Sequence, residues 1–537
     1  MSLRSLISLC VACVLALVAT RASAQDLHEA AKDLVSSDKA RVADAIDAIA
    51  KSSEPTALAL LEALSRDSLR VDATGAPFVI GEGDKLSPVF GGGGKPAGAL
   101  ATPLVDNRLR RQLEPALASL KLSFPDPQVR LEAATELAKG RNDELAPLIR
   151  AAAAKEQVAG IQRQLALALA QIDLRSDDKR LKLAAISVIT SAADASFKPD
   201  LERLVGAGKD KPSEPDAEVR KAATTALQAI ASRQMLVSFV SNLFYGLSLG
   251  SVLLLCALGL AITFGLLRVI NMAHGELLMI GAYSTYAVQR FFQAYFPGNQ
   301  DLYLVAAVPV AFVVTAAIGM ALERSVIRFL YGRPLETLLA TWGISLILIQ
   351  TVRLIFGAQN VAVANPSYLA GGIEVLPGFV LTYSRVAVIL FASAVTGFVW
   401  FMLQRTPLGL HVRAVTQNRT MAAGMGIATR RVDVWTFGIG SGVAGLGGVA
   451  LSQLGNVGPE LGQQYIVDSF MVVVLGGVGK LAGTLAGAFG LGILNKLLEP
   501  AAGAVLGKIV ILGIIILFIQ RRPQGIFALK GRAAEAM

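Results

Sequence analysis

The chain has 537 residues, of which 53% are hydrophobic and 17% are charged, and its mean hydropathy is +0.55. This composition excludes an ordinary soluble enzyme, and the length allows two domains. The formal charge of +10 does not indicate nucleic-acid binding, because residues 25–232 hold 28 Lys or Arg and 30 Asp or Glu, whereas the apolar residues 233–537 hold 20 and 10. A nucleic-acid binder would carry its basic excess on a soluble domain.

The first 24 residues have the pattern of a secretory signal peptide. A charged start precedes an apolar core at residues 6–18, and small residues follow before a cleavage position after Ala24. An uncleaved transmembrane helix is the alternative, but the apolar core is short for a crossing. Cleavage would leave Cys256 as the one cysteine of the mature chain, so no intramolecular disulfide could form.

Residues 25–232 contain several windows with one pattern, in which an acidic or polar start is followed by apolar and small residues at helical spacing. The windows begin at Ser37, Asp126, Asp177 and Asp216. A mean period near 45 residues is typical of HEAT or armadillo helix pairs. Asp126 and Pro127 supply an N-cap and a first-turn proline. We therefore expect an exported HEAT-like helical domain, with a generic helical domain as the alternative.

A glycine-rich segment at residues 81–103 interrupts these helices and is expected to be a flexible surface loop. Its GGGGKP sequence lacks the Gly-x4-Gly-Lys-Ser/Thr spacing of a phosphate-binding loop. A second Gly-Lys pair, Gly479 and Lys480, also lacks this motif, because the position of its first glycine is occupied by Val474. The motif occurs nowhere in the sequence. The chain is therefore not expected to hydrolyse ATP itself.

Residues 233–537 are predicted to form a polytopic helical membrane domain. Segments long enough to cross a bilayer lie at residues 236–267, 277–296, 304–327, 338–356, 380–403, 434–454 and 503–519. A further apolar stretch at residues 470–498 is broken by GGVGKLAG, which predicts two short helices or a re-entrant hairpin. The fold expected is therefore all-α, with residues 1–24 as signal peptide, 25–232 as the periplasmic domain and about nine crossings in the rest.

Loop charge predicts the orientation of this domain. If residues 25–232 are exported, alternate loops face the cytoplasm, and those loops hold 14 of the 20 basic residues in residues 233–537. This distribution follows the positive-inside rule. We therefore expect a multi-pass protein of the bacterial inner membrane, with a periplasmic N-terminal domain and a cytoplasmic C-terminus.

Three polar residues, Asn271, His274 and Glu276, lie between two long apolar runs. Polar side chains at membrane depth are costly unless they face protein, water or a substrate, so this group is a candidate functional site. The alternative is a helix end at the membrane interface, with His274 capping backbone carbonyls.

The longest inner loop, residues 404–433, contains a candidate amphipathic helix. Its Met and Ala residues, Met421 among them, lie between Arg419 and Arg430. Such residues in basic surroundings suit contact with a cytoplasmic partner, and a solvated loop is the alternative.

Several sequences resemble the membrane subunits of branched-chain amino acid type ABC importers. They are INMAHGELLMIGAY, TPLGLHVRAVTQNRTMAAGMGI and VVVLGGVGKLAG, and the resemblance covers the membrane half. ATWGISLILIQTVRLIFGAQN, GPELGQQYIVDSFMVVVLGGVGKLAG and the exported extension are similar to the urea transporter permease branch. The resemblance implies a pathway between two permease subunits, a periplasmic substrate-binding protein and cytoplasmic ATPase subunits that use the ATP. It implies no cofactor in this chain and no nucleic acid.

The expected substrate pathway follows from the chemistry of urea, which is small, planar and uncharged. Its path requires polar groups along an apolar wall, because an unpaired amide in a dry channel costs several kcal/mol. The residues expected to line it are Asn271, His274, Glu276, Gln463, Gln464 and Asp468. The residues expected in the ATPase-coupling loop are Arg413, Asn418, Arg419, Met421, Ala422 and Gly426. No catalytic or metal-ligating residue is expected.

Two other functions remain open from the sequence. A permease for short amides or branched-chain amino acids is the nearest alternative, and a zwitterion would require opposite charges or helix ends facing it. The few acidic residues at membrane depth favour the neutral solute. A membrane-anchored periplasmic docking or sensor protein is an alternative of another class, whereas a passive channel fits the basic inner loop poorly.

Overall fold

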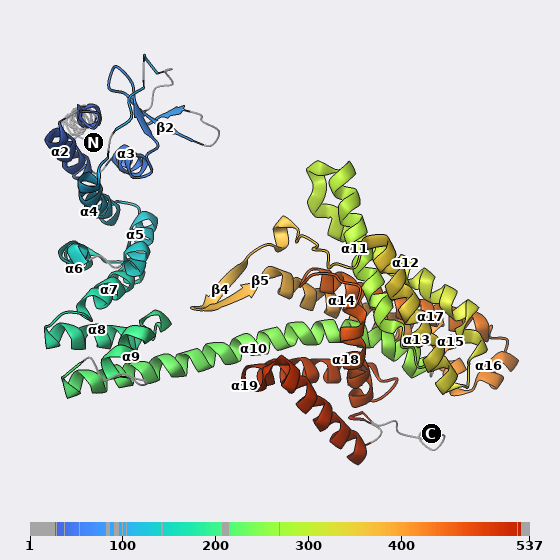
Figure 1. The fold of residues 1–537 in the computed structure, drawn as a ribbon. Coiled ribbons are helices and arrows are strands. Elements are labelled where there is room, and N and C mark those ends of the chain that lie inside the picture. Colours follow the sequence, from blue (N-terminus) through green and yellow to red (C-terminus); the bar gives the residue numbers. More distant parts are fainter. Residues whose placement is uncertain are drawn as a thin grey trace, which may run out of the picture. The chain divides into compact units, whose positions relative to one another are not determined.

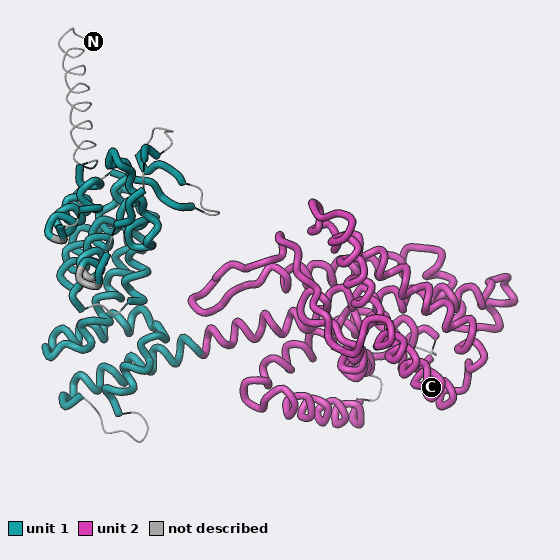
Figure 2. Tube along the Cα trace, turned by 45° about the horizontal axis from the view of Figure 1, so that its top comes forward, with its two compact units in different colours: residues 1–234 teal, residues 235–537 magenta. Residues whose placement is uncertain are grey.

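The computed structural model describes residues 27–527 apart from residues 28, 37, 53, 82–85, 91–95, 99, 104, 141–142, 207–213, 268 and 523–524. The chain divides into two compact units, residues 1–234 and 235–537 (Figure 2). Helices dominate both units (Figure 1). The predicted signal peptide, residues 1–24, lies outside the described residues.

The first unit contains a series of short helices. They are α2 (Lys39–Ala50), α3 (Pro55–Ser65), α4 (Asn107–Ser123), α5 (Pro127–Lys139), α6 (Ala146–Lys155), α7 (Ala159–Asp173), α8 (Lys179–Ala192) and α9 (Lys198–Val205), followed by α10 (Ala217–Leu267), which continues into the second unit. Each predicted window begins a helix. The carboxylates of Asp38, Asp126, Asp178 and Asp216 each accept a hydrogen bond from the N–H two residues further on, which is N-cap geometry.

Helices that are neighbours in sequence bury the apolar core of this unit. One cluster of buried residues extends from Leu27 to Leu120, a second from Leu122 to Ala168 and a third from Leu167 to Ile230. Packing between sequence neighbours is the arrangement expected of a helical solenoid. The HEAT-like repeat itself stays a prediction.

The expectation of an all-α fold was wrong in one respect, because short strands occur in both units. The first unit has an antiparallel sheet of β1 (Leu69–Val71), β2 (Pro77–Ile80) and β3 (Leu86–Pro88), and the second has a hairpin of β4 (Gly372–Leu376) and β5 (Phe379–Thr382). Part of the predicted flexible loop thus forms β3. Asp72 closes the turn between β1 and β2 by accepting hydrogen bonds from the N–H groups of Thr74 and Ala76. Strands of three to five residues are too short to show a clear alternation in sequence.

The second unit is a bundle of long helices. They are α11 (His274–Tyr295), α12 (Tyr303–Ser325), α13 (Pro334–Phe356), α14 (Tyr383–Arg405), α15 (Pro407–Gln417), α16 (Arg419–Gly424), α17 (Thr429–Ser452), α18 (Leu461–Gly476) and α19 (Leu481–Arg521). Among the described residues, six helical segments are long and apolar enough to cross a membrane. The other predicted crossings fall on α11, on the 16-residue α18 and on the part of α19 beyond Gly503, where the backbone leaves helical geometry.

Glycines allow α11 and α17 to pack with their backbones in contact. A Cβ on Gly281 would overlap the carbonyl group of Gly445, and a Cβ on Gly448 would overlap the carbonyl of Leu278. Small residues allow this approach between membrane helices. The two helices lie side by side with α12 in Figure 1.

Candidate functional site

The chain turns back into the bundle between α10 and α11. Residues 269–273 are not helical, and His274, the first residue of α11, has its Nε2 3.0 Å from the carbonyl oxygen of Cys256. A Cβ on Gly259 would lie 2.9 Å from Cε1 of the same ring. Cys256 and Gly259 precede Leu267, the end of α10, by two to three helical turns, or roughly 12–16 Å. Helix α11 therefore begins inside the bundle, not at its surface.

A second helix begins at the same place. A Cβ on Gly275 would lie 2.5 Å from the carbonyl oxygen of Gly462, so the first turns of α11 and α18 are in contact. Helix α18 then returns toward the end of α10, where a Cβ on Gly265 would lie 2.8 Å from the Cα of Gly479. Helix α11 leads the other way. Each N-terminus carries a partial positive charge and N–H groups without intrahelical partners, so the junction is a site where negative charge is stabilised.

The side chains of Asn271, His274 and Glu276, which we call the polar junction, are at most 1% exposed. Oδ1 of Asn271 accepts from the N–H of Ala273 at 3.0 Å, and Oε1 of Glu276 accepts from the Ser345 hydroxyl at 2.6 Å. The structure buries all three predicted residues, and each has a different hydrogen-bond partner. The prediction that His274 caps a backbone carbonyl also fits its contact with Cys256, but at a depth that excludes an interfacial helix end.

Only some of the polar atoms in the polar junction have a hydrogen-bond partner. Asn271 Nδ2, His274 Nδ1 and Glu276 Oε2 have no hydrogen-bond partner among the described residues. A buried polar atom without a partner costs about 1–3 kcal/mol. Three such atoms lie at the start of α11, beside the N-terminus of α18, with His274 facing α10 and Glu276 facing α13, and each can still form a hydrogen bond with a polar molecule.

The other predicted pathway residues lie on α18. Gln463 and Gln464 lie in the first turn of α18, directly after Gly462, but their side chains are exposed. Asp468 is buried and its Oδ2 lies 3.2 Å from Nζ of Lys508 on α19, so it forms an ion pair apart from the junction.

Helix α13 contributes site residues that the sequence analysis did not single out. Ser345 contacts Glu276, and the Thr341 hydroxyl oxygen accepts from the N–H of Met272 at 3.1 Å. Thr337, Thr341 and Ser345 are all buried and are spaced four residues apart. A polar stripe at helical spacing on an apolar helix was the signal that could have identified them.

The predicted coupling loop forms α15 and α16. Asn418 caps α16, because its Oδ1 accepts from the N–H of Met421 at 2.9 Å. The side chains of Met421 and Met425 are 65% and 79% exposed, whereas Ala422 is buried against the bundle. Gly426 ends the segment with a φ of +85°, a conformation that favours glycine. A short helix at the predicted place is confirmed, with Ala422 as its one buried residue.

Two arginines connect α15 and α16 to neighbouring parts of the bundle. Arg419 forms an ion pair with Asp433 at the start of α17, and its guanidinium carbon lies 5.2 Å from the ring centre of Tyr331. The Tyr331 hydroxyl contacts Oε1 of the buried Glu323 on α12 at 3.2 Å. Arg413 donates to the carbonyl of Leu403 at the end of α14. A movement of α16 would therefore be transmitted to α12 and α17.

Comparison with known proteins identifies the second unit. Residues 242–519 match the family described as branched-chain amino acid transport system, permease component. The chain is 29% identical over 292 residues to the high-affinity branched-chain amino acid transport system permease protein BraD of Pseudomonas aeruginosa, covering 54% of this chain and 95% of that protein. It is 30% identical over 293 residues to the corresponding LivH protein of Escherichia coli K12, with the same coverage. A probable LivH protein of Methanocaldococcus jannaschii is 27% identical over 300 residues, covering 51% of this chain and 88% of that protein.

No solved structure matches the chain. The relatives are permease subunits of ABC transporters, which are not catalytic, and this chain is likewise a non-catalytic subunit. With more than half of its residues matched, the chain belongs to the family of branched-chain amino acid transport system permeases.

Proposed function

We propose that the chain is a permease subunit of an ATP-driven importer for branched-chain amino acids, and that the polar junction contacts the substrate during transport. The relatives named above are permeases of branched-chain amino acid transport systems, which supports the substrate class. The observation that carries the proposal is the meeting of two helix N-termini beside buried polar atoms that lack partners.

The junction offers partners for both charged groups of an amino acid. N–H groups in the first turn of α18, together with the amide of Asn271, can donate to the substrate carboxylate, and the two helix dipoles favour its charge. Oε2 of Glu276 can accept from the ammonium group. Each charge is then matched in a dry site, where an unmatched charge would be strongly disfavoured.

Access to the junction requires a conformational change, because its three side chains are closed off from solvent in this structure. A route for that change runs through named contacts. Arg419 links α16 to Asp433 on α17, and Gly445 further along α17 lies against Gly281 on α11. In the proposed mechanism, displacement of α16 by an ATPase subunit moves α17 and α11 and opens the junction to one side.

The proposal also covers the partner subunits of this permease and its orientation in the membrane. The exposed Met421 and Met425 suit an apolar pocket on a cytoplasmic ATPase subunit. A second permease subunit completes the pathway, and a periplasmic binding protein delivers the substrate. The arginine-rich end of the second unit faces the cytoplasm of a bacterial cell with the C-terminus, and the first unit, proposed to be HEAT-like, lies in the periplasm.

Urea is the second candidate substrate. The three unpartnered atoms of the junction belong to a carboxylate, an amide and an imidazole, and no lysine or arginine forms a hydrogen bond with these side chains in the described structure. Urea has one acceptor and four N–H donors, and such a group could satisfy them without any fixed cation.

Uptake into cells tests the proposal. A strain lacking this chain is complemented with the wild-type chain, and the initial rates of labelled leucine and labelled urea uptake are compared. Restored leucine uptake that unlabelled valine inhibits and urea does not is the expected result. Restored urea uptake that leucine leaves unchanged would replace the proposed substrate with the second candidate. Restoration of neither solute would reject both.

A further inference from the structure

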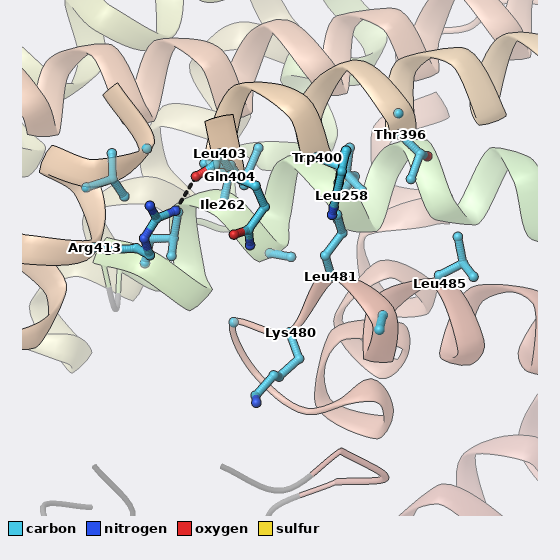
Figure 3. Close-up of a pocket in the computed structure, with 17 residues that line it drawn as sticks. Leu258, Ile262, Thr396, Trp400, Leu403, Gln404, Arg413, Lys480, Leu481 and Leu485 are labelled. Carbon is cyan, nitrogen blue, oxygen red and sulfur yellow. Dashed lines mark hydrogen bonds between the residues drawn. The ribbon is translucent and has the colours of Figure 1, made fainter. Parts of the chain in front are cut away.

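The second unit has a cavity separate from the polar junction. Its volume is about 580 Å³, and it lies between α10, α14, α15 and the turn that joins α18 to α19 (Figure 3). It extends along α10 from Leu258 to Leu266 and along α14 from Thr396 to Gln404. Eight residues of helix measure roughly 12 Å, so the cavity is an elongated slot parallel to the helices.

The slot is apolar along its length and basic at one end. In Figure 3 Arg413 lies at one end of the slot and Thr396 and Leu485 lie at the other, whereas Lys480 lies on the turn below, nearer the Arg413 end. Of the 17 residues that line the slot, Arg413 and Lys480 are the cations and none is acidic. The basic end is that of Leu266, near the terminus of α10 that the loop charges predict to be cytoplasmic.

Both cations are held where an anion could reach them. Arg413 uses one N–H group on the carbonyl of Leu403, and a guanidinium has four more. Lys480 follows Gly479, whose backbone lies against Gly265, and its ammonium group has no ion-pair partner among the residues that the structure describes. Trp400 is half exposed at the wall of the slot, as tryptophan often is at the level of lipid headgroups.

From this arrangement we propose that the slot binds an anionic phospholipid of the cytoplasmic leaflet. The phosphate group lies against Arg413 and Lys480, and one acyl chain fills the apolar length between α10 and α14. Basic pockets between membrane helices on the cytoplasmic side suit such headgroups, and an apolar slot between two membrane helices suits an acyl chain. The bound lipid would brace α15, which carries Arg413 and leads into α16. The inference is independent of the proposed substrate.

Retention of lipid by the purified full-length chain tests the inference. The probes are phosphatidylglycerol and phosphatidylcholine of matched chain length, and bound lipid is counted by native mass spectrometry after detergent exchange. Wild-type chain should retain phosphatidylglycerol in preference to phosphatidylcholine. Equal retention of the two lipids would overturn the assignment of an anionic headgroup.

Two variants locate the lipid. Lys480→Gln should weaken phosphatidylglycerol retention about fivefold, the effect of one basic residue near an anionic headgroup. Gly397→Leu fills the apolar length, where a Cβ meets open space, and should abolish retention. Normal retention by either variant would overturn the inference.

Matched controls separate the slot from general surface effects. Arg430→Gln removes an exposed positive charge from the same loop region outside the slot, and Gly343→Leu adds the same side chain at an open position on α13. Both should retain lipid as the wild type does. Loss in Arg430→Gln equal to that in Lys480→Gln would mean that net charge alone attracts the lipid. Thermal unfolding of each variant verifies that it is folded.

Discussion

We expect the two partners of the Arg419–Asp433 ion pair to differ in how much their removal destabilises the protein. The Asp433 side chain is 1% exposed and that of Arg419 is 47% exposed. Removing the partner of a fully buried charge costs about 3–5 kcal/mol. Because Arg419 is half exposed and water can enter when it is removed, we expect Arg419→Ala to destabilise the second unit by about 2 kcal/mol. Asp433→Asn leaves the guanidinium in solvent and should cost about 1 kcal/mol or less.

Thermal unfolding of the purified full-length chain in detergent measures these costs. At about 2–4 °C per kcal/mol, Arg419→Ala should lower the Tm by about 4–8 °C and Asp433→Asn by at most half as much. The double variant should be more stable than Arg419→Ala alone, because it no longer buries an unpaired carboxylate. Arg430→Ala, which removes an exposed arginine of the same region, is the control and should unfold as the wild type does. Equal costs for the two single variants, or additive costs in the double variant, would refute the reasoning.

Three further predictions concern other parts of the chain. Gly281→Ala inserts a methyl group against the backbone of α17 and should destabilise the protein by about 1–3 kcal/mol, whereas Gly343→Ala, at an open position, should leave the Tm near that of the wild type. Asn418→Ala removes the α16 N-cap and should cost about 1 kcal/mol of local stability, measured as faster amide exchange in that helix. Hydrogen bonds from Thr74 and neighbouring N–H groups lower the pKa of Asp72 below its value in the unfolded chain. The stability that the ionised Asp72 contributes is therefore complete above the unfolded pKa and is lost as the pH falls from there toward the lower folded pKa. Amide exchange in β1 and β2 should therefore accelerate on acidification, and Asp72→Asn should remove that pH dependence.

Features set by local sequence could be predicted. The Asp126 cap of α5, the break at residues 477–480 and the short helix α16 all depend on neighbouring residues, and the structure has them at the expected places. The three residues of the polar junction were identifiable because polar side chains stand out within apolar runs.

Features set by tertiary packing could not be predicted. Nothing local to His274 shows that α11 begins beside Cys256, since this depends on residues 269–273 turning back along α10. The pairing of Asp468 with Lys508 joins residues 40 positions apart, and it depends on the bend of α19 near Gly503. The short strands depend on a turn closed by one carboxylate, which leaves little trace in the pattern of apolar residues.

Leucine uptake by variants of Glu276 tests whether this carboxylate contacts the substrate during transport. The measurement is the initial rate of labelled leucine uptake by cells with the wild-type chain, Glu276→Gln or Glu460→Gln, each at equal protein level. Glu460 is an exposed carboxylate in an ion pair with Arg353 at 2.6 Å, which makes it a matched control. The account predicts at least about a tenfold loss in Glu276→Gln, as expected when a charged partner of the substrate is removed, and near-normal uptake in Glu460→Gln. Wild-type uptake by Glu276→Gln would contradict the account.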